Sequence, residues 1–262
     1  MVSSNNSQGE LWGTAPEDWA LYLEITFIPL YKKIISRVGL NAAHNILDIG
    51  CGSGLFMKMA GVKAGTSTGI DISGELLQIA KQRNPSAVFV NQDMEQLSFA
   101  ENSFDLVTGF NSLQYAQNIP GLFRKIKNVL KAEGKLAIGV WGSPEECESL
   151  RVLASVASLL PAAAPGTPGP LALSGDDHIE SLLNGAGLRV IEKGTIDCPW
   201  NFSSLDEALK GILSAGPSAE AINYAGKEKV REQLVATLKA FNFVDEVYVL
   251  ENVFHYIIAG KA

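Results

Sequence analysis

The feature that most constrains this chain is a glycine-rich turn that follows directly on a short apolar segment. Residues 46–54 are ILDIGCGSG, and a helical pattern continues over residues 53–60. Glycine adopts positive φ angles and lets a ligand approach the backbone closely. The pattern predicts a buried strand that runs into a tight turn and then a helix, as at the ligand sites of open α/β sheets. Taken alone, the glycines are weak evidence, because they also fit a tight strand–helix turn without a ligand.

Three acidic residues follow successive predicted strands. Asp48 stands just before the first glycine, Asp71 ends the second strand, and Asp93 follows the third. The spacing G-x-G-x-G differs from the dinucleotide pattern G-x-G-x-x-G. A carboxylate beside this turn opposes a pyrophosphate and suits a ligand that carries an ammonium and a sulfonium group.

The positions of the other two acids extend this argument to a nucleoside. Asp71 stands where an acid accepts hydrogen bonds from both hydroxyls of a ribose. Asp93 and the backbone N–H of Met94 are placed to contact the amine edge of an adenine. Each acid alone also fits a turn or a helix cap, so the order of all three carries the prediction.

Strands and helices alternate over about 100 residues. Strands are predicted at 45–49, 67–72, 87–91, 104–109 and 135–141, and helices at 53–60, 74–83 and 120–130. Short connections between alternating elements indicate parallel βαβ units and a doubly wound sheet. Two further strands are predicted at 188–198 and 253–259.

The flanking regions have a helical pattern. One helix is predicted at 17–38 with a break at Pro29, and others at 145–160 and 176–185, on either side of a proline-rich connector at 161–170. Ser204 and Glu207 form a capping-box pattern that opens a helix ending before Gly216. We therefore expect a single domain with an N-terminal helical cap segment (1–40), a ligand-binding core (41–142), and cap helices with the last two core strands (143–262).

Composition excludes several classes of protein. The 262 residues are 47% hydrophobic, so a chain disordered throughout is excluded, and the net charge of −7 disfavours nucleic acid as a partner. Three widely spaced cysteines suggest neither disulfides nor zinc, and no acidic cluster suggests another metal. No apolar run has the length of a membrane span and the N-terminal residues are polar, so we expect a cytoplasmic protein without a membrane partner. Oligomeric state is not indicated.

Five segments in this order resemble the class I S-adenosylmethionine-dependent methyltransferases, especially the ubiquinone/menaquinone-type small-molecule enzymes. They are ILDIGCGSG, GIDIS, NQDMEQLSF, FDLVTGFNSLQYA and LKAEGKLAIGVWG. The resemblance implies a Rossmann-like, doubly wound, mostly parallel seven-stranded sheet with a helical cap. It also implies S-adenosyl-L-methionine as cofactor, S-adenosyl-L-homocysteine as product, and a small organic molecule as methyl acceptor.

The resemblance assigns each part of the cofactor to matching residues. It places the methionine part on Asp48 and the loop of Gly50, Cys51, Gly52 and Gly54, the ribose on Asp71, the adenine on Ile72, Asp93 and Met94, and the sulfonium side beside Phe110. Small residues commonly occupy the position of Cys51, which favours a structural role over a reactive thiol.

Candidate substrate residues surround this predicted site. Asn111 and Gln114 follow the fourth strand, and LWGTAPEDWA is similar to segments that cover the cofactor in related enzymes. Within it, Trp12 and Trp19 either close over the ligand or anchor the N-terminal helix. His178 either faces substrate or adds polarity at a helix start.

We further expect the N-terminal helix, residues 143–174 and residues 203–248 to form an apolar lid over the substrate. Its candidate lining residues, for which core packing is an equal explanation, are Leu150, Val152, Leu159, Leu160, Leu205, Leu209, Ile212 and Phe241.

No catalytic base or acid is indicated. In-line methyl displacement releases a neutral thioether, so proximity, orientation and exclusion of water can account for catalysis. Three alternatives remain: an RNA or protein methyltransferase, a non-methylating relative that binds the same cofactor, and a nicotinamide-dependent reductase. The sequence Gly109-Phe110-Asn111-Ser112 replaces the Asn/Asp-Pro-Pro-Tyr/Phe motif of amine-directed DNA and glutamine methyltransferases, which disfavours those two groups.

Overall fold

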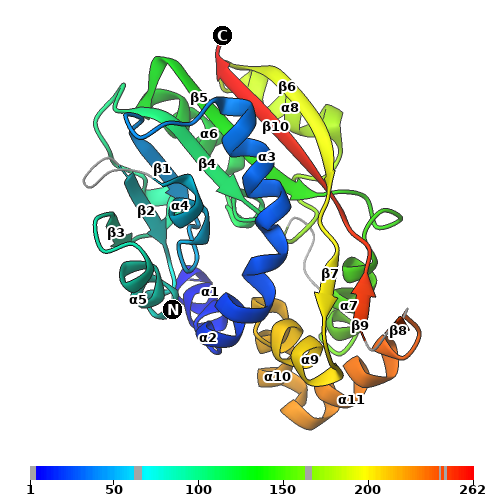
Figure 1. The fold of residues 1–262 in the computed structure, drawn as a ribbon. Helices are drawn as coiled ribbons and strands as arrows, with labels where there is room; N and C mark the ends of the chain where they lie inside the picture. The colour runs from blue at the N-terminus through cyan, green and yellow to red at the C-terminus, as the bar shows by residue number, and fades with distance from the viewer. Residues whose placement is uncertain (1–3, 62–66, 163–166, 242, 245–246) are drawn as a thin grey trace.

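The protein folds around a twisted seven-stranded sheet (Figure 1). The computed structural model describes residues 4–61, 67–162, 167–241, 243–244 and 247–262. In the order β3-β2-β1-β4-β5-β10-β6, the strands are Val88–Asn91, Ser67–Asp71, Ile46–Ile49, Phe104–Phe110, Leu130–Trp141, Val253–Lys261 and Leu188–Asp197. The first five are parallel, and β10 is antiparallel to both of its neighbours. The predicted Rossmann-like α/β sheet is confirmed.

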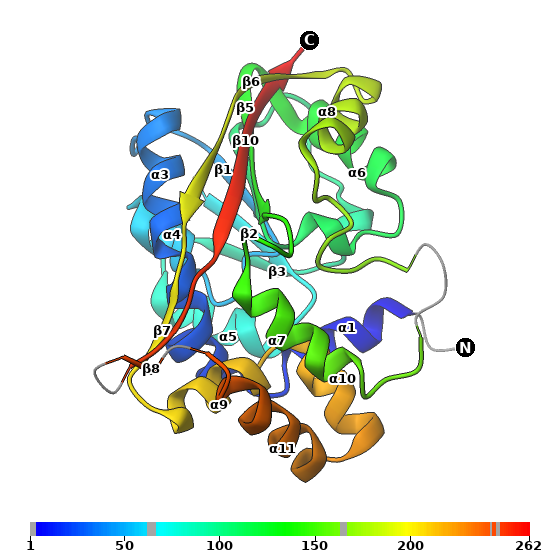
Figure 2. The ribbon, with the colours of Figure 1, turned by 90° about the vertical axis from the view of Figure 1, so that its right-hand side faces the viewer.

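Helices cover both faces of the sheet, as Figure 2 shows. On one side lie α3 (Ile28–Val38), α4 (Leu55–Ala60) and α5 (Gly74–Arg83), and on the other α6 (Ile119–Val129) and α8 (Asp176–Gly185). Apolar side chains of the helices and strands form a separate buried cluster on each side. The near-continuous burial of β1 follows from this two-sided cover, because parallel strands are packed on both faces.

A group of helices lies beyond the carboxyl ends of the parallel strands (Figures 1 and 2). It contains α7 (Glu148–Ala157), α9 (Leu205–Leu213), α10 (Gly216–Ala225) and α11 (Lys227–Leu238), joined by a small antiparallel sheet of β7 (Trp200–Phe202), β9 (Val247–Leu250) and β8 (Phe243–Val244). The N-terminal helix α1 (Ser4–Trp12) lies between this group and the large sheet, against α10, and the short helix α2 (Pro16–Asp18) packs against α5.

Several helix starts follow the sequence signals. The Ser73 hydroxyl accepts a hydrogen bond from the N–H of Leu76 at 3.2 Å at the start of α5. The capping box of α9 is also confirmed, because Ser204 Oγ accepts from the Glu207 N–H at 3.2 Å and the Glu207 carboxylate accepts from the Ser203 N–H at 2.9 Å.

Other elements differ from the sequence prediction. Helix α1 lies in the polar N-terminal segment before residue 17, where no helix was predicted, and β5 begins at Leu130 rather than at residue 135. The helix predicted at 17–38 is divided into α2, a π turn (Trp19–Leu23), a 3₁₀ turn (Glu24–Phe27) and α3. Pro29 lies in the first turn of α3, where its missing N–H costs no helical hydrogen bond. Of the proline-rich connector, residues 163–166 lie outside the described residues.

Candidate functional site

A cavity opens at the carboxyl ends of β1, β2 and β4 and has two differently lined parts. The first part is polar and is formed by loops of the sheet: Asp48, Gly50, Cys51, Gly52, Asp71, Ile72, Gln92, Asp93, Met94, Asn111 and Ser112. The second part, which we call the aromatic chamber, is lined by Leu23, Phe27, Tyr31, Phe110, Trp141, Leu153 and Trp200. Both parts belong to one continuous cavity, so a ligand in one has access to the other.

The glycine loop forms the floor of the polar part. Its turn is fixed to β2, because the N–H groups of Gly50 and Cys51 both donate to the carbonyl of Ile70, at 2.8 and 3.0 Å. Gly50 and Gly52 have φ angles of 70° and 53°. A Cβ at Gly52 would lie 2.6 Å from the ring of Trp19, so glycine is required here by backbone conformation and by close packing together.

Asp71 is the last residue of β2, and its carboxylate contacts the glycine loop. One carboxylate oxygen accepts from the Gly52 N–H and the other from the Ser73 N–H, both at 2.9 Å. Burial raises the pKa of Asp71, and these backbone hydrogen bonds oppose the rise. Each oxygen has a second lone pair, and the residue lines the cavity, so the carboxylate can accept further hydrogen bonds from a ligand.

Asp48 is the most deeply buried acid of the cavity. It accepts a hydrogen bond from the Thr108 hydroxyl at 2.7 Å. Burial raises its pKa from 3.8 to about 7, although the Thr108 hydrogen bond opposes this, and the carboxylates of Glu24 and Asp71 raise it further. A cation bound nearby would favour the ionised form.

A buried ion pair supports the glycine loop from the side of the N-terminal segment. Glu24 is 1% exposed, accepts from Arg83 at 2.6 Å and from the hydroxyl of Ser53, and its other oxygen lies 3.4 Å from the Leu55 N–H. Burial raises the pKa of Glu24, and Arg83 opposes the rise. The sequence prediction missed this residue. Its signal was a carboxylate within one helical turn of Leu23 and Phe27, on the face that enters the core.

The loop after β3 contributes Asp93 and Met94 to the polar part of the cavity. Asp93 caps the 3₁₀ turn Met94–Gln96 by accepting from the Glu95 N–H at 2.9 Å. Asp93 therefore both caps this turn and lines the cavity.

The loop after β4 holds Asn111 in a left-handed conformation, with φ 52°. Asn111 lines the cavity, and its side-chain oxygen accepts from Gln114 Nε2 at 2.5 Å. Gln114 is fully buried and does not line the cavity itself, so it orients Asn111. Strained backbone at a pocket is held by its surroundings and is common at functional sites.

The remaining sequence candidates separate into two groups. Trp12 and Trp19 line the cavity, and Trp12 packs edge-on against Tyr115 at 6.0 Å between ring centroids. Cys51 also lines it, but burial raises the pKa of its thiol, which disfavours a reactive thiolate. His178 is exposed on α8 and is not among the described residues that line the cavity.

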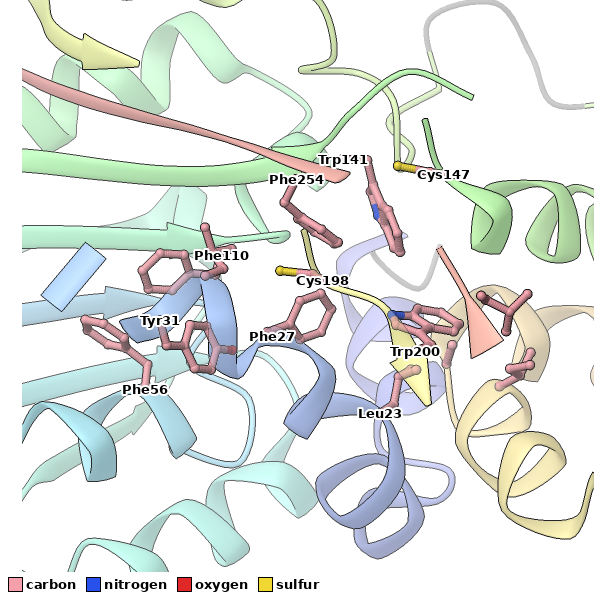
Figure 3. Close-up of a cluster of buried hydrophobic side chains, with 14 of the residues drawn as sticks. Leu23, Phe27, Tyr31, Phe56, Phe110, Trp141, Cys147, Cys198, Trp200 and Phe254 are labelled. Carbon is pink, nitrogen blue, oxygen red and sulfur yellow. The ribbon is translucent and has the colours of Figure 1, made fainter. Parts of the chain in front are cut away.

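Figure 3 shows how the aromatic chamber is assembled from distant parts of the chain. Phe27 and Tyr31 come from the N-terminal segment, Phe110 from β4, Trp141 from β5 and Trp200 from β7. The ring centroids of Tyr31 and Phe110 are 5.0 Å apart, and those of Trp141 and Trp200 are 5.8 Å apart. Sequence analysis did not select these residues as substrate contacts, because alone they are ordinary core aromatics.

The eight predicted lid residues do not line the cavity. The side chains from the cap that do so are Leu153, Ala215, Pro217 and Trp200. The eight instead lie in or against the buried cluster on the α3 side, because α7, α9 and α11 turn these faces toward one another. The predicted candidates are Leu150, Val152, Leu159, Leu160, Leu205, Leu209, Ile212 and Phe241.

The charged side chains among the described residues that line the cavity are all acidic. Among the described residues, the lining includes Asp48, Asp71, Asp93 and Glu95 but no lysine, arginine or histidine. A pyrophosphate would meet these carboxylates without a basic partner, whereas an ammonium or sulfonium would be stabilised by them. The polar part of the cavity thus fits a cationic nucleoside better than a nicotinamide dinucleotide. In the part of the chain that the structure describes, no cluster of three or more metal-ligating side chains occurs.

Comparison with known proteins places this architecture in a class. Residues 47–138 match the methyltransferase domain family. Among curated relatives, the malonyl-[acyl-carrier protein] O-methyltransferase of Buchnera aphidicola is 36% identical over 38% of this chain and 41% of its own. The demethylmenaquinone methyltransferase of Tropheryma whipplei is 32% identical over 43% of this chain and 48% of its own. The matched segment thus spans less than half of each relative.

Solved structures match over a greater length. A putative methyltransferase from Bacillus halodurans superimposes with a TM-score of 0.60 at 16% identity, covering 88% of this chain and 98% of that one. The [4+2]-cyclase SpnF gives 0.56 at 17% identity, with 88% and 79% covered. A Haemonchus contortus phosphoethanolamine N-methyltransferase in complex with S-adenosylhomocysteine gives 0.54 at 20% identity, with 88% and 52% covered. At these identities the likeness concerns the fold.

The fold is therefore that of the class I S-adenosylmethionine-dependent methyltransferases. More particularly, residues 47–138 match the methyltransferase domain family, and the cofactor of this class is S-adenosylmethionine. None of the helices in the described part of the chain has the length and apolar character needed to cross a membrane.

Proposed function

We propose that this protein transfers a methyl group from S-adenosylmethionine to a small organic molecule. The observation that carries the proposal is the continuity of the cavity, in which the acid-lined glycine loop opens directly into the aromatic chamber. A cofactor and an acceptor can then lie next to each other, out of contact with bulk water. Relatives named demethylmenaquinone methyltransferase and trans-aconitate 2-methyltransferase support a small-molecule acceptor.

Seven residues of the polar part have binding roles in this proposal. Asp48, with the backbone of Gly50 and Gly52, holds the methionine part, and Asp71 accepts hydrogen bonds from the ribose. Gly54, which the sequence assigned with them, is not among the described residues that line the cavity, and its carbonyl accepts a hydrogen bond from Asn84. Asp93, Met94 and Ile72 surround the adenine, and Phe110 lies beside the sulfonium. Bound S-adenosylmethionine supplies an electrophilic methyl carbon with a neutral thioether as leaving group.

Catalysis then depends on placement rather than on proton transfer. The walls of the aromatic chamber hold the acceptor atom in line with the methyl group and exclude water, which together account for large rate enhancements. Trp12 and Trp19 close the cavity from the N-terminal side. No residue is assigned as a general base, because the reaction needs none when the acceptor enters unprotonated.

The proposal is tested by turnover with methyl-labelled S-adenosylmethionine and a panel of small-molecule acceptors. We expect S-adenosylhomocysteine to accumulate in parallel with label in an organic product, and Asp71→Ala to slow both at subsaturating cofactor. Glu220→Gln, at an exposed position on α10, is the control that keeps full activity. Tight cofactor binding without transfer to any acceptor, small or macromolecular, would instead identify a non-methylating relative.

A further inference from the structure

The aromatic chamber has a chemical character that restricts its occupant. Its walls are the rings of Phe27, Tyr31, Phe110, Trp141 and Trp200, completed by Leu23 and Leu153. Such walls favour flat, apolar groups, which gain both burial of surface and ring contacts.

Charged acceptors are disfavoured in this chamber. An anionic group would lie near Asp48 and Glu24, and among the described residues no basic side chain lines the cavity to neutralise it. Burying an unpaired charge is costly. A cationic group would instead share the cavity with the sulfonium that the proposed function places there, and like charges repel strongly in a poorly hydrated site. An uncharged acceptor avoids both costs.

Trp200 provides one specific polar contact. Its side chain is 1% exposed, and its Nε1–H has no hydrogen-bonding partner among the described residues. In Figure 3 the nitrogen of Trp200 lies on the side of the ring that is turned toward Phe27, another wall of the chamber. A buried donor without a partner is unfavourable and is normally satisfied by a ligand or a water molecule.

Trp200 and Phe110 lie toward opposite ends of this aromatic cluster (Figure 3). Phe110 is beside Asn111 at the end of β4, next to the proposed place of the sulfonium. A molecule anchored at Trp200 therefore extends its other end toward the methyl group, which makes Trp200 a positioning residue.

We propose that the methyl acceptor is an uncharged, largely apolar ring compound that lies between these aromatic walls and offers one carbonyl or ether oxygen to Nε1–H of Trp200. This inference rests on the proposed function and specifies its substrate class. Carboxylates, phosphates and ammonium compounds are thereby excluded as preferred acceptors.

Three matched naphthalenes test the proposal by equilibrium dialysis with protein saturated with S-adenosylhomocysteine. They are 2-acetylnaphthalene, which carries the oxygen, 2-naphthoate, which adds a negative charge, and 2-ethylnaphthalene, which lacks the oxygen. We expect wild-type protein to bind the ketone at least tenfold more tightly than the carboxylate. Trp200→Phe should weaken the ketone about fivefold more than the hydrocarbon, the effect of one neutral hydrogen bond.

Trp141→Phe is the control, because it trims the same chamber without removing the Trp200 donor, and it should weaken ketone and hydrocarbon by the same factor. The proposal is overturned if 2-naphthoate binds as tightly as the ketone, if Trp200→Phe weakens ketone and hydrocarbon equally, or if none of the three binds. The comparison of ketone with carboxylate needs only wild-type protein, so a poorly folded variant does not prevent the test.

A separate titration with S-adenosylhomocysteine keeps this result distinct from the proposed function. Failure of that titration would contradict the cofactor assignment. The dialysis series is also run on the ligand-free protein, so the preference of the chamber is measured in either case.

Discussion

At the scale of single residues, burial gives the acids of the cavity their properties. Asp48, Asp71 and Glu24 all have raised pKa values, with burial as the largest cause. Each is also held by hydrogen bonds, from Thr108, from backbone N–H groups, or from Arg83 and Ser53. The protein thus keeps acidic groups in a poorly hydrated place where a cationic ligand compensates for their charge.

The raised pKa of Asp48 predicts how stability depends on pH. Between pH 3.8 and about 7 the folded protein holds a proton at Asp48 that the unfolded chain has released, so raising the pH across this range lowers the unfolding free energy. We expect a loss on the order of 2 kcal/mol between pH 5 and 7.5, most of it absent in Asp48→Asn. Urea unfolding of the ligand-free protein measures it.

Asp105→Asn is the control for this measurement. The pKa of Asp105 is lowered by its hydrogen bonds and by Lys131, although its partial burial opposes this, so the group is ionised in both folded and unfolded protein throughout the range. Its variant should keep the wild-type pH dependence. An unchanged slope in Asp48→Asn would show that Asp48 is ionised in the folded protein.

Gly52 gives a second prediction at this scale. Gly52→Ala places a methyl group 2.6 Å from the Trp19 ring at a φ of 53°. We expect cofactor affinity to fall at least tenfold, because the loop or Trp19 must move. Gly61→Ala is the control, since Gly61 has a φ of 61° with nothing near its Cβ position. Equal cofactor affinity in the two variants, measured by calorimetry, would contradict the close packing.

At the scale of elements, the predictability of the fold varied with burial. Strands β1 and β4 were predicted because their sequences, ILDI and FDLVTGF, are mostly apolar, as is usual for parallel strands covered on both faces. Helix α1 was missed because SNNSQGELW has little apolar periodicity, and its place depends on tertiary contacts. The β7–β9 pairing was missed because Trp200 and Phe202 are separated in sequence from their partners by the helices of the cap.

The contact of α1 with the cavity gives a prediction. A Cβ at Gly9 would lie 2.6 Å from the Ile72 carbonyl oxygen, which is backbone and cannot move aside easily. We expect Gly9→Ala to displace α1 and speed dissociation of S-adenosylhomocysteine several-fold, as measured by stopped-flow. At Gly13 the atom nearest to an added Cβ is the flexible end of the Glu75 side chain. S-adenosylhomocysteine should therefore dissociate from Gly13→Ala at the wild-type rate. If the ligand leaves both variants at the wild-type rate, α1 does not slow its dissociation.

The buried ion pair between Arg83 on α5 and Glu24 in the N-terminal segment gives a prediction about stability. Arg83→Met leaves Glu24 buried without its cation, and we expect a loss of about 3 kcal/mol in unfolding free energy. Adding Glu24→Gln should restore part of it. In Arg37→Met the partner Glu192 is at the surface, so no measurable loss is expected. The unfolding free energies of the variants are measured by chemical denaturation. Equal stability of both Arg variants would contradict a structural role for the pair.

At the scale of the whole molecule, the two parts of the cavity differed in how well sequence revealed them. The glycine loop and Asp48 form one contiguous segment, and Asp71 and Asp93 follow adjacent strands, so local pattern brings them together. The aromatic chamber combines residues from positions 23 to 200, and no local pattern distinguishes Trp141 or Trp200 from core residues. Glu24 had a weak local signal in its apolar neighbours Leu23 and Phe27, but its place beside the glycine loop depends on its pairing with Arg83, which is distant in sequence.

The division of the chain into a core at 41–142 and flanking cap segments remains a prediction. The arrangement is consistent with it, because α7, α9, α10 and α11 gather at one end of the sheet (Figure 2). The cap contributes Leu153, Trp200, Ala215 and Pro217 to the cavity. We therefore expect acceptor choice to be determined mainly by the cap, and cofactor binding by the core.

The most direct test of the account is calorimetric titration of S-adenosylmethionine, S-adenosylhomocysteine and NADH into wild-type protein and Asp71→Ala. We expect micromolar binding of the first two ligands and none of NADH. We also expect a loss on the order of 1–3 kcal/mol of binding free energy in Asp71→Ala, from the ribose hydrogen bonds. Absence of binding of both S-adenosyl compounds to folded wild-type protein would contradict the central claim.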